Sequence, residues 1–259
     1  MQPDYKKTAV FLEVAVRELC GFNSPPRTKV LDFGCGPGNL LNLLLRDGFD
    51  AYGCDITAHW SKDLLAVQER LGVISLTPYR LPFAKNTFDI VISTSVLEHV
   101  RNKEECFREI HRVLRPNGYS LHIYPGKWYL PYDPHTYVPL SNYFGRSCPR
   151  WWFGLWAILG TGTKKQRNQS WRKFFESNYK YYREELFYWS NRQYRKLSLR
   201  IFGNCSWPMQ FYINNAPGGF AGTFRKLPFK KFSGWLLKEC RMSFLVQQKR
   251  IDKLPNPNN

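Results

Sequence analysis

One ten-residue stretch constrains the fold more than any other: residues 30–39, which read Val-Leu-Asp-Phe-Gly-Cys-Gly-Pro-Gly-Asn. Two apolar residues lead into Asp32, glycines follow at positions 34, 36 and 38, and a leucine-rich helical pattern begins at Leu40. Glycine is required where the backbone adopts a positive φ or lies directly against a ligand. The stretch therefore predicts a strand, a tight turn and a helix, the unit in which parallel sheets bind nucleotide-like ligands.

The spacing of the glycines separates two classes of ligand. A dinucleotide fingerprint needs its third glycine at position 39, and that residue is Asn39. Asp32 directly before the turn also argues against a pyrophosphate, because a carboxylate repels that group and attracts a cationic amino-acid group. We therefore expect a ligand with a cationic end; an ordinary turn without a ligand is the alternative.

Three segments resemble class I S-adenosylmethionine (SAM) dependent methyltransferases. Residues 32–38 resemble the first motif of that family, Asp-x-Gly-x-Gly-x-Gly, at every position. Residues 81–100 resemble the "LPF…FDxV…LEH" run of type 11 methyltransferases, and residues 104–124 resemble the family's fifth helix and strand. The resemblance covers about half of the chain. It implies SAM as cofactor and a Rossmann-like, doubly wound, mostly parallel α/β sheet of seven strands.

The same resemblance implies a set of cofactor residues. Asp55 ends a predicted second strand, where a carboxylate accepts hydrogen bonds from both ribose hydroxyls. Thr77 stands where the family usually has an acid that accepts from the adenine amino group, and backbone groups near Tyr79 and Arg80 are the alternative. Glu98 and His99 are expected to brace a loop. The full implied set is Asp32, Gly34, Cys35, Gly36, Gly38, Asp55, Ile56, Thr77, Ser93, Thr94 and Leu97.

The chain divides by composition. Residues 1–125 alternate predicted strands and helices, which indicates the SAM-binding core, and Pro125-Gly126 ends that rhythm. We predict an aromatic, basic helical insertion over 126–206 that recognises the acceptor, with one long helical region at 171–201. Residues 207–259 are predicted to supply the sixth and seventh strands (207–214 and 242–250), a mobile connection at Gly218, Gly219 and Gly222, and a frayed tail after Lys253.

The segment that leaves the fifth strand, 128–140, combines prolines, aromatic residues and His135. It emerges at the carboxyl edge of the sheet, where a transferable methyl group would lie. We take His135 as the candidate general base and Asp133 as its orienter; a histidine that only ties the loop by hydrogen bonds is the alternative. The candidate wall residues of the acceptor site are Tyr124, Tyr132 and Tyr137.

The net charge of +18 lies almost entirely in the second half of the chain. Residues 1–125 hold 15 Lys and Arg against 14 Asp and Glu, whereas residues 126–259 hold 23 against 6, together with eight of the nine tryptophans. A basic, aromatic surface suits anionic lipids, phosphate-bearing substrates or nucleic acid, and a solvated face is the alternative. No nucleic-acid-binding signature supports RNA as a partner.

The most apolar run, residues 150–160, contains three tryptophans and is shorter than the about 20 residues that span a bilayer. Internal packing or an oligomer contact is the first interpretation, and an interfacial helix on an anionic membrane is the second. No export signal is present, and the seven scattered cysteines predict neither a disulfide framework nor a metal site. We therefore expect a cytoplasmic protein, with contact at the inner membrane face under the second interpretation.

These observations predict a SAM-dependent methyltransferase. Asp133-Pro134-His135 also resembles, over a short length, methyltransferases that accompany glycan-assembly enzymes, which implies a hydroxyl of a sugar, glycan or lipid-linked saccharide as acceptor. One alternative is a methyltransferase of another small molecule or lipid with a nitrogen or carbon acceptor. Another is a non-catalytic module that keeps the fold and binds RNA or membrane through its basic half.

Overall fold

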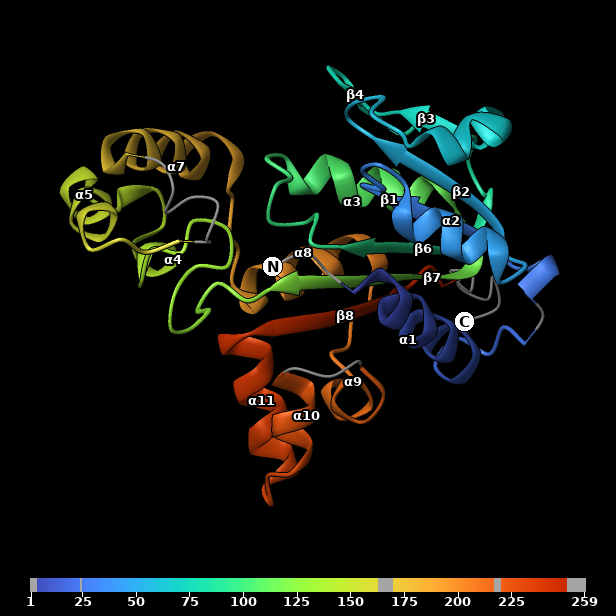
Figure 1. Ribbon diagram of the computed structural model, residues 1–259. Coiled ribbons are helices and arrows are strands. Elements are labelled where there is room, and N and C mark those ends of the chain that lie inside the picture. The colour runs from blue at the N-terminus through green and yellow to red at the C-terminus, as the bar shows by residue number, and fades with distance from the viewer. Residues whose placement is uncertain (1–3, 24, 163–169, 217–219, 251–259) are drawn as a thin grey trace, which may run out of the picture.

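A six-stranded sheet forms the centre of the computed structural model, which describes residues 4–23, 25–162, 170–216 and 220–250 (Figure 1). The strand order is β3-β2-β1-β6-β7-β8; β8 is antiparallel to β7 and the other pairs are parallel. A separate two-stranded sheet, β4-β5, is antiparallel. The strands are β1 (Lys29–Phe33), β2 (Asp50–Asp55), β3 (Leu71–Val73), β4 (Ser75–Leu76), β5 (Tyr79–Arg80), β6 (Phe88–Thr94), β7 (Leu114–Pro125) and β8 (Met242–Gln248).

Helices cover both faces of the sheet, and alternate strand residues enter the two resulting cores. Val30 and Ile90 pack with α1 (Tyr5–Glu18), α2 (Asn39–Arg46), α9 (Met209–Asn215), α10 (Phe220–Arg225) and α11 (Lys230–Cys240). Leu31 and Val91 pack on the opposite face with α3 (Lys103–Val113) and α8 (Asn191–Phe202). The described chain also includes the short helices η1 (Pro25–Arg27) and η2 (Lys62–Arg70).

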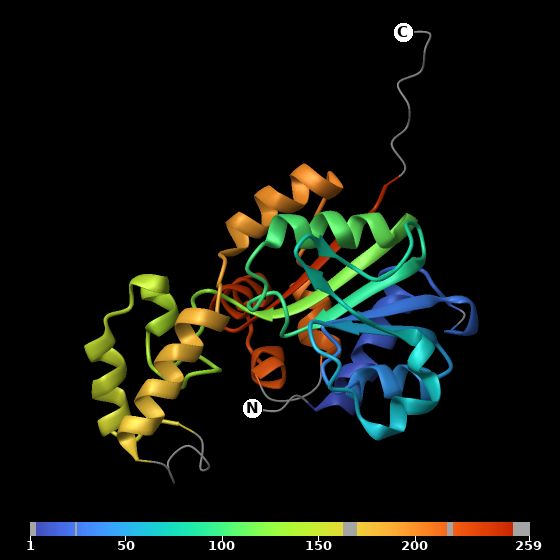
Figure 2. The same cartoon turned by 90° about the horizontal axis from the view of Figure 1, so that it is seen from above.

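A separate lobe, which we call the cap, stands beside the carboxyl edge of the sheet (Figure 2). It contains α4 (Ser141–Phe144), η3 (Gly145–Ser147), α5 (Arg150–Ile158) and α7 (Trp171–Glu185). The cap has a small core of its own, formed by Val138, Cys148, Phe153, Tyr182 and Leu186. None of the described helices is long and apolar enough to cross a bilayer.

The prediction of a sixth strand at 207–214 is wrong. These residues form α9, which buries Met209 and Ile213 at the i, i+4 spacing of a helix, so the sheet has six strands rather than seven. Ser206 makes only an isolated bridge to Val246. The predicted antiparallel edge strand is confirmed as β8.

Two further expectations need correction. The predicted helical region at 171–201 is two helices, α7 and α8, because Ser190 and Gln193 form a capping box that starts a new helix. Gly222 lies inside α10 rather than in a connection. Gly218, Gly219 and the tail after Lys253 fall outside the described residues.

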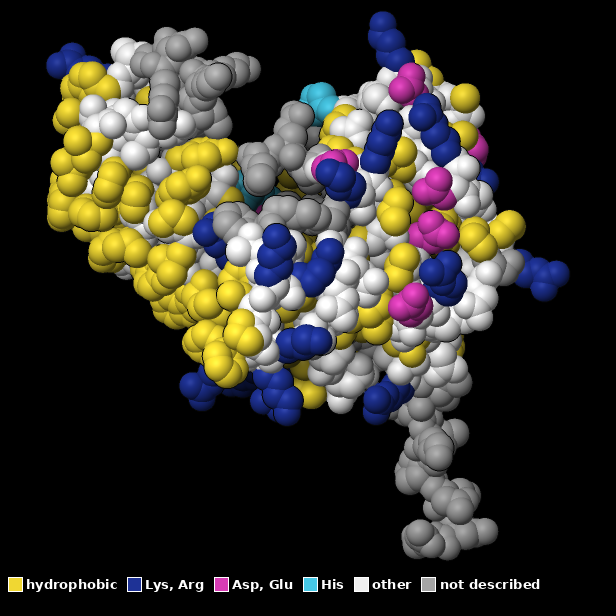
Figure 3. All heavy atoms as spheres, turned by 60° about the horizontal axis from the view of Figure 1, so that its bottom comes forward, with side chains coloured by type: hydrophobic (Ala, Val, Ile, Leu, Met, Phe, Trp, Pro, Cys, Tyr) yellow, Lys and Arg dark blue, Asp and Glu magenta, His cyan; other side chains and the backbone are white. Residues whose placement is uncertain are grey.

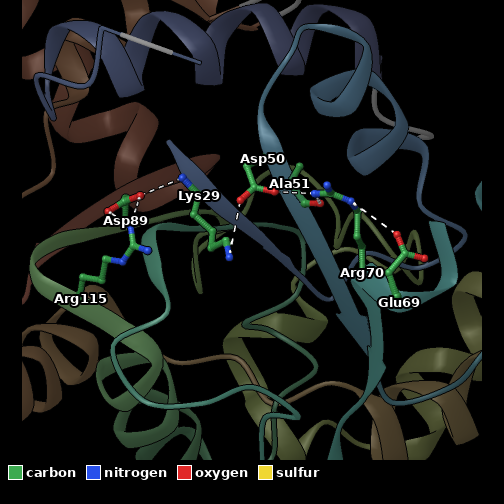
Figure 4. A network of polar contacts seen from close by, with 7 residues as sticks. All are labelled: Lys29, Asp50, Ala51, Glu69, Arg70, Asp89 and Arg115. Atoms are coloured by element: carbon green, nitrogen blue, oxygen red, sulfur yellow. Dashed lines mark hydrogen bonds and ion pairs between the residues drawn. The ribbon is translucent and has the colours of Figure 1, made fainter. Parts of the chain in front are cut away.

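Charged side chains tie the strands together at their amino ends (Figure 4). Asp89 accepts from the backbone N–H of Lys29 at 2.8 Å and from Arg115 Nη1 at 2.9 Å, and Lys29 Nζ lies 3.6 Å from Asp50. Arg70 joins the other side of Asp50. This network lies at the amino ends of the strands. The glycine turn lies at the carboxyl ends, which is the edge where open parallel sheets bind ligands.

Candidate active site

All three glycines of the turn adopt the left-handed backbone that favours this residue: φ is 74° at Gly34, 52° at Gly36 and 86° at Gly38. A Cβ at Gly34 would lie 2.4 Å from Val96, and one at Gly38 would lie 2.0 Å from Leu64. A Cβ at Gly36 would meet no atom within 4 Å. The positive φ disfavours a side chain at all three positions. At Gly34 and Gly38 a side chain would also displace Val96 and Leu64, whereas Gly36 borders open space that a ligand can fill.

Asp32 is a buried carboxylate at the end of β1, with 3% of its surface exposed. Its Oδ2 is buried and has no hydrogen-bond partner. Burial raises the pKa of Asp32 to about 7, and the negative charge of Asp55 adds to the effect. An unpaired buried carboxylate is costly, so a cationic ligand group would be stabilised here, which fits the amino-acid end of SAM.

Asp55 closes the turn from β2. One carboxylate oxygen accepts from the N–H of Gly36 and the other from the N–H of Ile56, both at 2.7 Å. Each carboxylate oxygen can accept a second hydrogen bond, so Asp55 still has room to accept from the ribose hydroxyls. These ribose contacts stay a prediction. The Ile56 side chain is exposed, and Thr77 lies exposed between β4 and β5.

The predicted cofactor residues at and after the carboxyl end of β6 differ in burial and in hydrogen bonding. Ser93 Oγ lies 2.7 Å from Nδ1 of His122, and both residues are buried. Burial lowers the pKa of His122 to about 3, which makes it a neutral structural residue. Leu97 is fully buried, whereas Thr94 Oγ1 is buried without a partner and is available to a ligand. Cys35 is buried beside the turn, and burial raises the pKa of its thiol.

His135 faces a carboxylate that the sequence did not suggest. Its Nε2 lies 3.4 Å from Oε1 of Glu98, a carboxylate that is 1% exposed. Burial opposes protonation of His135, but the hydrogen bond and charge of Glu98 outweigh it, so the pKa of His135 is raised. Asp133 instead uses Oδ1 to accept from the backbone N–H groups of His135 and Thr136, at 2.9 and 2.7 Å. The carboxylate next to the ring is therefore Glu98, and Asp133 shapes the loop.

His99 joins this pair and braces the loop as expected. Its Nδ1 lies 3.0 Å from the carbonyl oxygen of Glu185, at the end of α7, and its ring centroid is 5.0 Å from that of His135. Donor atoms of Glu98, His99 and His135 all lie within 4.8 Å of one another. Two imidazoles and a carboxylate can hold a divalent transition metal, so among the described residues this set is the candidate for one.

The predicted wall residues divide into two groups. Tyr132 and Tyr137 stack with ring centroids 5.6 Å apart, and Tyr132 is partly exposed. Tyr124 is 1% exposed and donates its hydroxyl to Asn191 Oδ1 at 2.8 Å. Tyr124 therefore presents no free surface to an acceptor in this structure.

Residues 31–121 match the family model described as "Methyltransferase domain", the type 11 branch. The chain carries a class I methyltransferase domain. The cofactor of this domain is SAM, which fits the turn, the orphaned oxygen of Asp32 and the position of Asp55. The match begins in β1 and ends in β7, so it includes every predicted cofactor residue and leaves the cap outside.

Similar proteins share the domain and differ elsewhere. An uncharacterized methyltransferase of Mycobacterium sp. (strain JLS) is 30% identical over 47% of this chain and 48% of its own length. The arginine-hydroxylase NDUFAF5, mitochondrial, of Mus musculus is 34% identical over 34% of this chain and 26% of its own length. The chain thus spans about half or less of these curated relatives.

A solved structure shows the same fold over most of the chain. It is phosphoethanolamine N-methyltransferase 2 of Haemonchus contortus in complex with phosphomonomethylethanolamine and S-adenosylhomocysteine. The TM-score is 0.52 at 14% identity, and the alignment covers 93% of this chain and 52% of that chain. The likeness confirms the predicted Rossmann-like methyltransferase fold.

Proposed function

We propose that the chain transfers the methyl group of SAM to a hydroxyl of a sugar, glycan or lipid-linked saccharide. The observation that carries the choice of oxygen is the His135–Glu98 pair, 3.4 Å apart at the carboxyl edge of the sheet. An alcohol is a weak nucleophile until a base takes its proton, and a histidine beside a buried carboxylate supplies that base. A free amine needs no such group.

The proposed step balances without another reactant. SAM supplies a methyl group on a sulfonium that leaves as a neutral thioether. As the acceptor oxygen forms its bond to the methyl carbon, the hydroxyl proton passes to His135 Nδ1, the ring nitrogen that does not face Glu98. Glu98, 3.4 Å from Nε2, stabilises the imidazolium that forms. The buried loop residues mainly hold the reactants in line and exclude water.

The cap supports a saccharide acceptor. Tyr132 and Tyr137 present a stacked aromatic pair in the loop that carries His135. Sugar rings carry apolar C–H faces that pack on aromatic rings, and their hydroxyls are the nucleophiles the base requires. A lipid-linked saccharide also accords with peripheral contact at an anionic membrane, for which the exposed residues of the cap and α11 provide the surface.

A tritium-methyl transfer screen over sugar nucleotides, glycolipids, amines and RNA tests the proposal. We expect label in a saccharide, as an ether stable to mild acid and base. Label in an amine would replace the oxygen acceptor with a nitrogen acceptor. SAM binding without labelled product from any pool would favour the alternative of a non-catalytic module.

Glu98 gives a sharper test, because it acts through His135. Glu98 raises the pKa of His135, so Glu98→Gln should move the acidic limb of the pH–rate profile to lower pH and reduce turnover. Affinity for SAM should stay unchanged. A Glu98→Gln enzyme with an unmoved acidic limb would separate the pair from catalysis.

A further inference from the structure

Helix α5 has one buried face and one exposed face, so internal packing accounts for only part of the tryptophan-rich run. Phe153 and Ala157 pack into the cap, as internal packing predicts. Trp151, Leu155 and Ile158 lie on the other side of the helix at i, i+4 and i+7, and all three are exposed. The helix is anchored by one face and presents the other to the surroundings.

A second group of exposed apolar side chains lies on α11. We call the two groups together the interfacial face; in Figure 3 hydrophobic side chains spread over the cap and toward the middle of the molecule, where Lys and Arg border them. Contiguous exposed apolar patches on a protein surface mark sites of interaction with another protein or with a membrane. The face is defined by Trp151, Ile158, Leu159, Phe229, Phe232 and Trp235, each 53–73% exposed.

The charge around the interfacial face selects its partner. Residues 126–259 hold 23 basic against 6 acidic residues, and the acidic residues next to the face, Glu176 and Glu239, pair with Arg150 and Lys238 at 2.5 and 3.1 Å. A hollow of ≈520 Å³ beside α11 is lined by Trp207 and Trp235 together with Lys230, Lys231 and Lys238. Tryptophan beside lysine suits the boundary between lipid head groups and acyl chains.

We propose that the interfacial face binds an anionic lipid bilayer, with the aromatic side chains at the head-group level and the lysine-lined hollow against lipid phosphates. This inference rests on the proposed function in one respect only: binding to the bilayer would bring a lipid-linked acceptor to the site. The loop that leads to His135 is joined to the end of α11: the N–H groups of Gly126 and Leu130 donate to the carbonyls of Arg241 and Cys240, at 2.8 and 3.0 Å. The helix that carries part of the interfacial face is thus hydrogen-bonded to the segment that leads to His135.

Co-sedimentation of the full chain with lipid vesicles tests the inference. The assay contains neither SAM nor acceptor, so its result does not depend on whether the chain transfers a methyl group. At about 50 mM salt, where charge is weakly screened, we expect binding to vesicles with about 30% anionic lipid and little binding to zwitterionic ones. Trp151→Ser with Phe229→Ser should weaken binding at least about tenfold. Lys230→Gln with Lys231→Gln should weaken binding and reduce its salt dependence.

Matched control variants come from the other half of the molecule. Val10 and Leu76 are 59% and 58% exposed on α1 and β4, and Val10→Ser with Leu76→Ser should bind vesicles like the wild type. Equal loss in this control, or no sedimentation of the wild type at low salt, would overturn the inference. A dimer in light scattering that Trp151→Ser with Phe229→Ser dissociates, without vesicle binding by the wild type, would assign the face to a second copy instead.

Discussion

The two halves of this chain meet different physical demands. Residues 1–125 have almost equal numbers of acidic and basic residues and place a buried carboxylate, Asp32, beside three glycines with positive φ. Residues 126–259 have an excess of 17 positive charges and expose several large aromatic residues, among them Trp151, Phe229 and Trp235. The first half is built to hold one small cation by backbone geometry, whereas the second half is built to meet a large anionic or amphipathic partner by surface composition.

The sharpest way to test this division is His135→Ala, which removes the proposed base from the second half. Turnover should fall by about 10²–10⁴-fold, the usual contribution of general base catalysis. Affinity for SAM, measured by calorimetry, should be unchanged, because the cofactor groups lie in the first half. Unchanged turnover would remove His135 from the mechanism and leave it as a loop residue.

A pair of core substitutions compares how the two regions are stabilised. Phe107 is fully buried in the main core, so Phe107→Ala should lower the free energy of unfolding of the whole chain by about 3–5 kcal/mol. Phe153 belongs to the small cap core, so Phe153→Ala should increase amide exchange mainly in α5 and α7 and leave SAM affinity unchanged. Loss of SAM binding in Phe153→Ala would show that the cap is not separable from the core.

The pH dependence of SAM binding isolates Asp32. Its pKa of about 7 means that the carboxyl group is protonated below that pH and attracts the cationic ligand only above it. Affinity should rise up to about tenfold per pH unit below pH 7 and level off above it. Asp32→Asn should weaken binding by about 10–100-fold at pH 8 and remove the pH dependence. A pH-dependent Asp32→Asn variant would assign the titration to another group.

The smallest expected effect is that of metal removal. If His135 acts as a base, EDTA should leave turnover within about twofold of the untreated enzyme, because the base mechanism needs no metal. Loss of activity with EDTA, restored by Zn²⁺ or Mn²⁺, would assign Glu98, His99 and His135 to a metal site and replace the base mechanism.

The first half was predictable because its motifs are local. The strand, turn and helix around Gly36 depend on neighbouring residues: α2 begins at Asn39, next to the predicted start at Leu40, and β2 ends at Asp55 as predicted. The contact between Glu98 and His135 joins two loops 37 positions apart, and no spacing rule gives such a distance. The break between α7 and α8 did carry a local signal, the Ser190-x-x-Gln193 capping box.

The misassigned strand at 207–214 has a different cause. Its apolar residues fit both an alternating and a helical period over so short a length, and Pro208 just before Met209 favours a helix start. The packing of Met209 and Ile213 against the sheet decides the outcome, and that packing depends on α1 and α11, which are distant in sequence. Local pattern alone could not settle it.

The dipeptide Glu98-His99 also fastens the cap to the core. The Glu98 carbonyl accepts from the N–H of Phe187 at 2.7 Å, and His99 meets the Glu185 carbonyl, while the Glu98 side chain faces His135. A displacement of the cap relative to the core would therefore break these contacts or move residues 98 and 99 together with the cap.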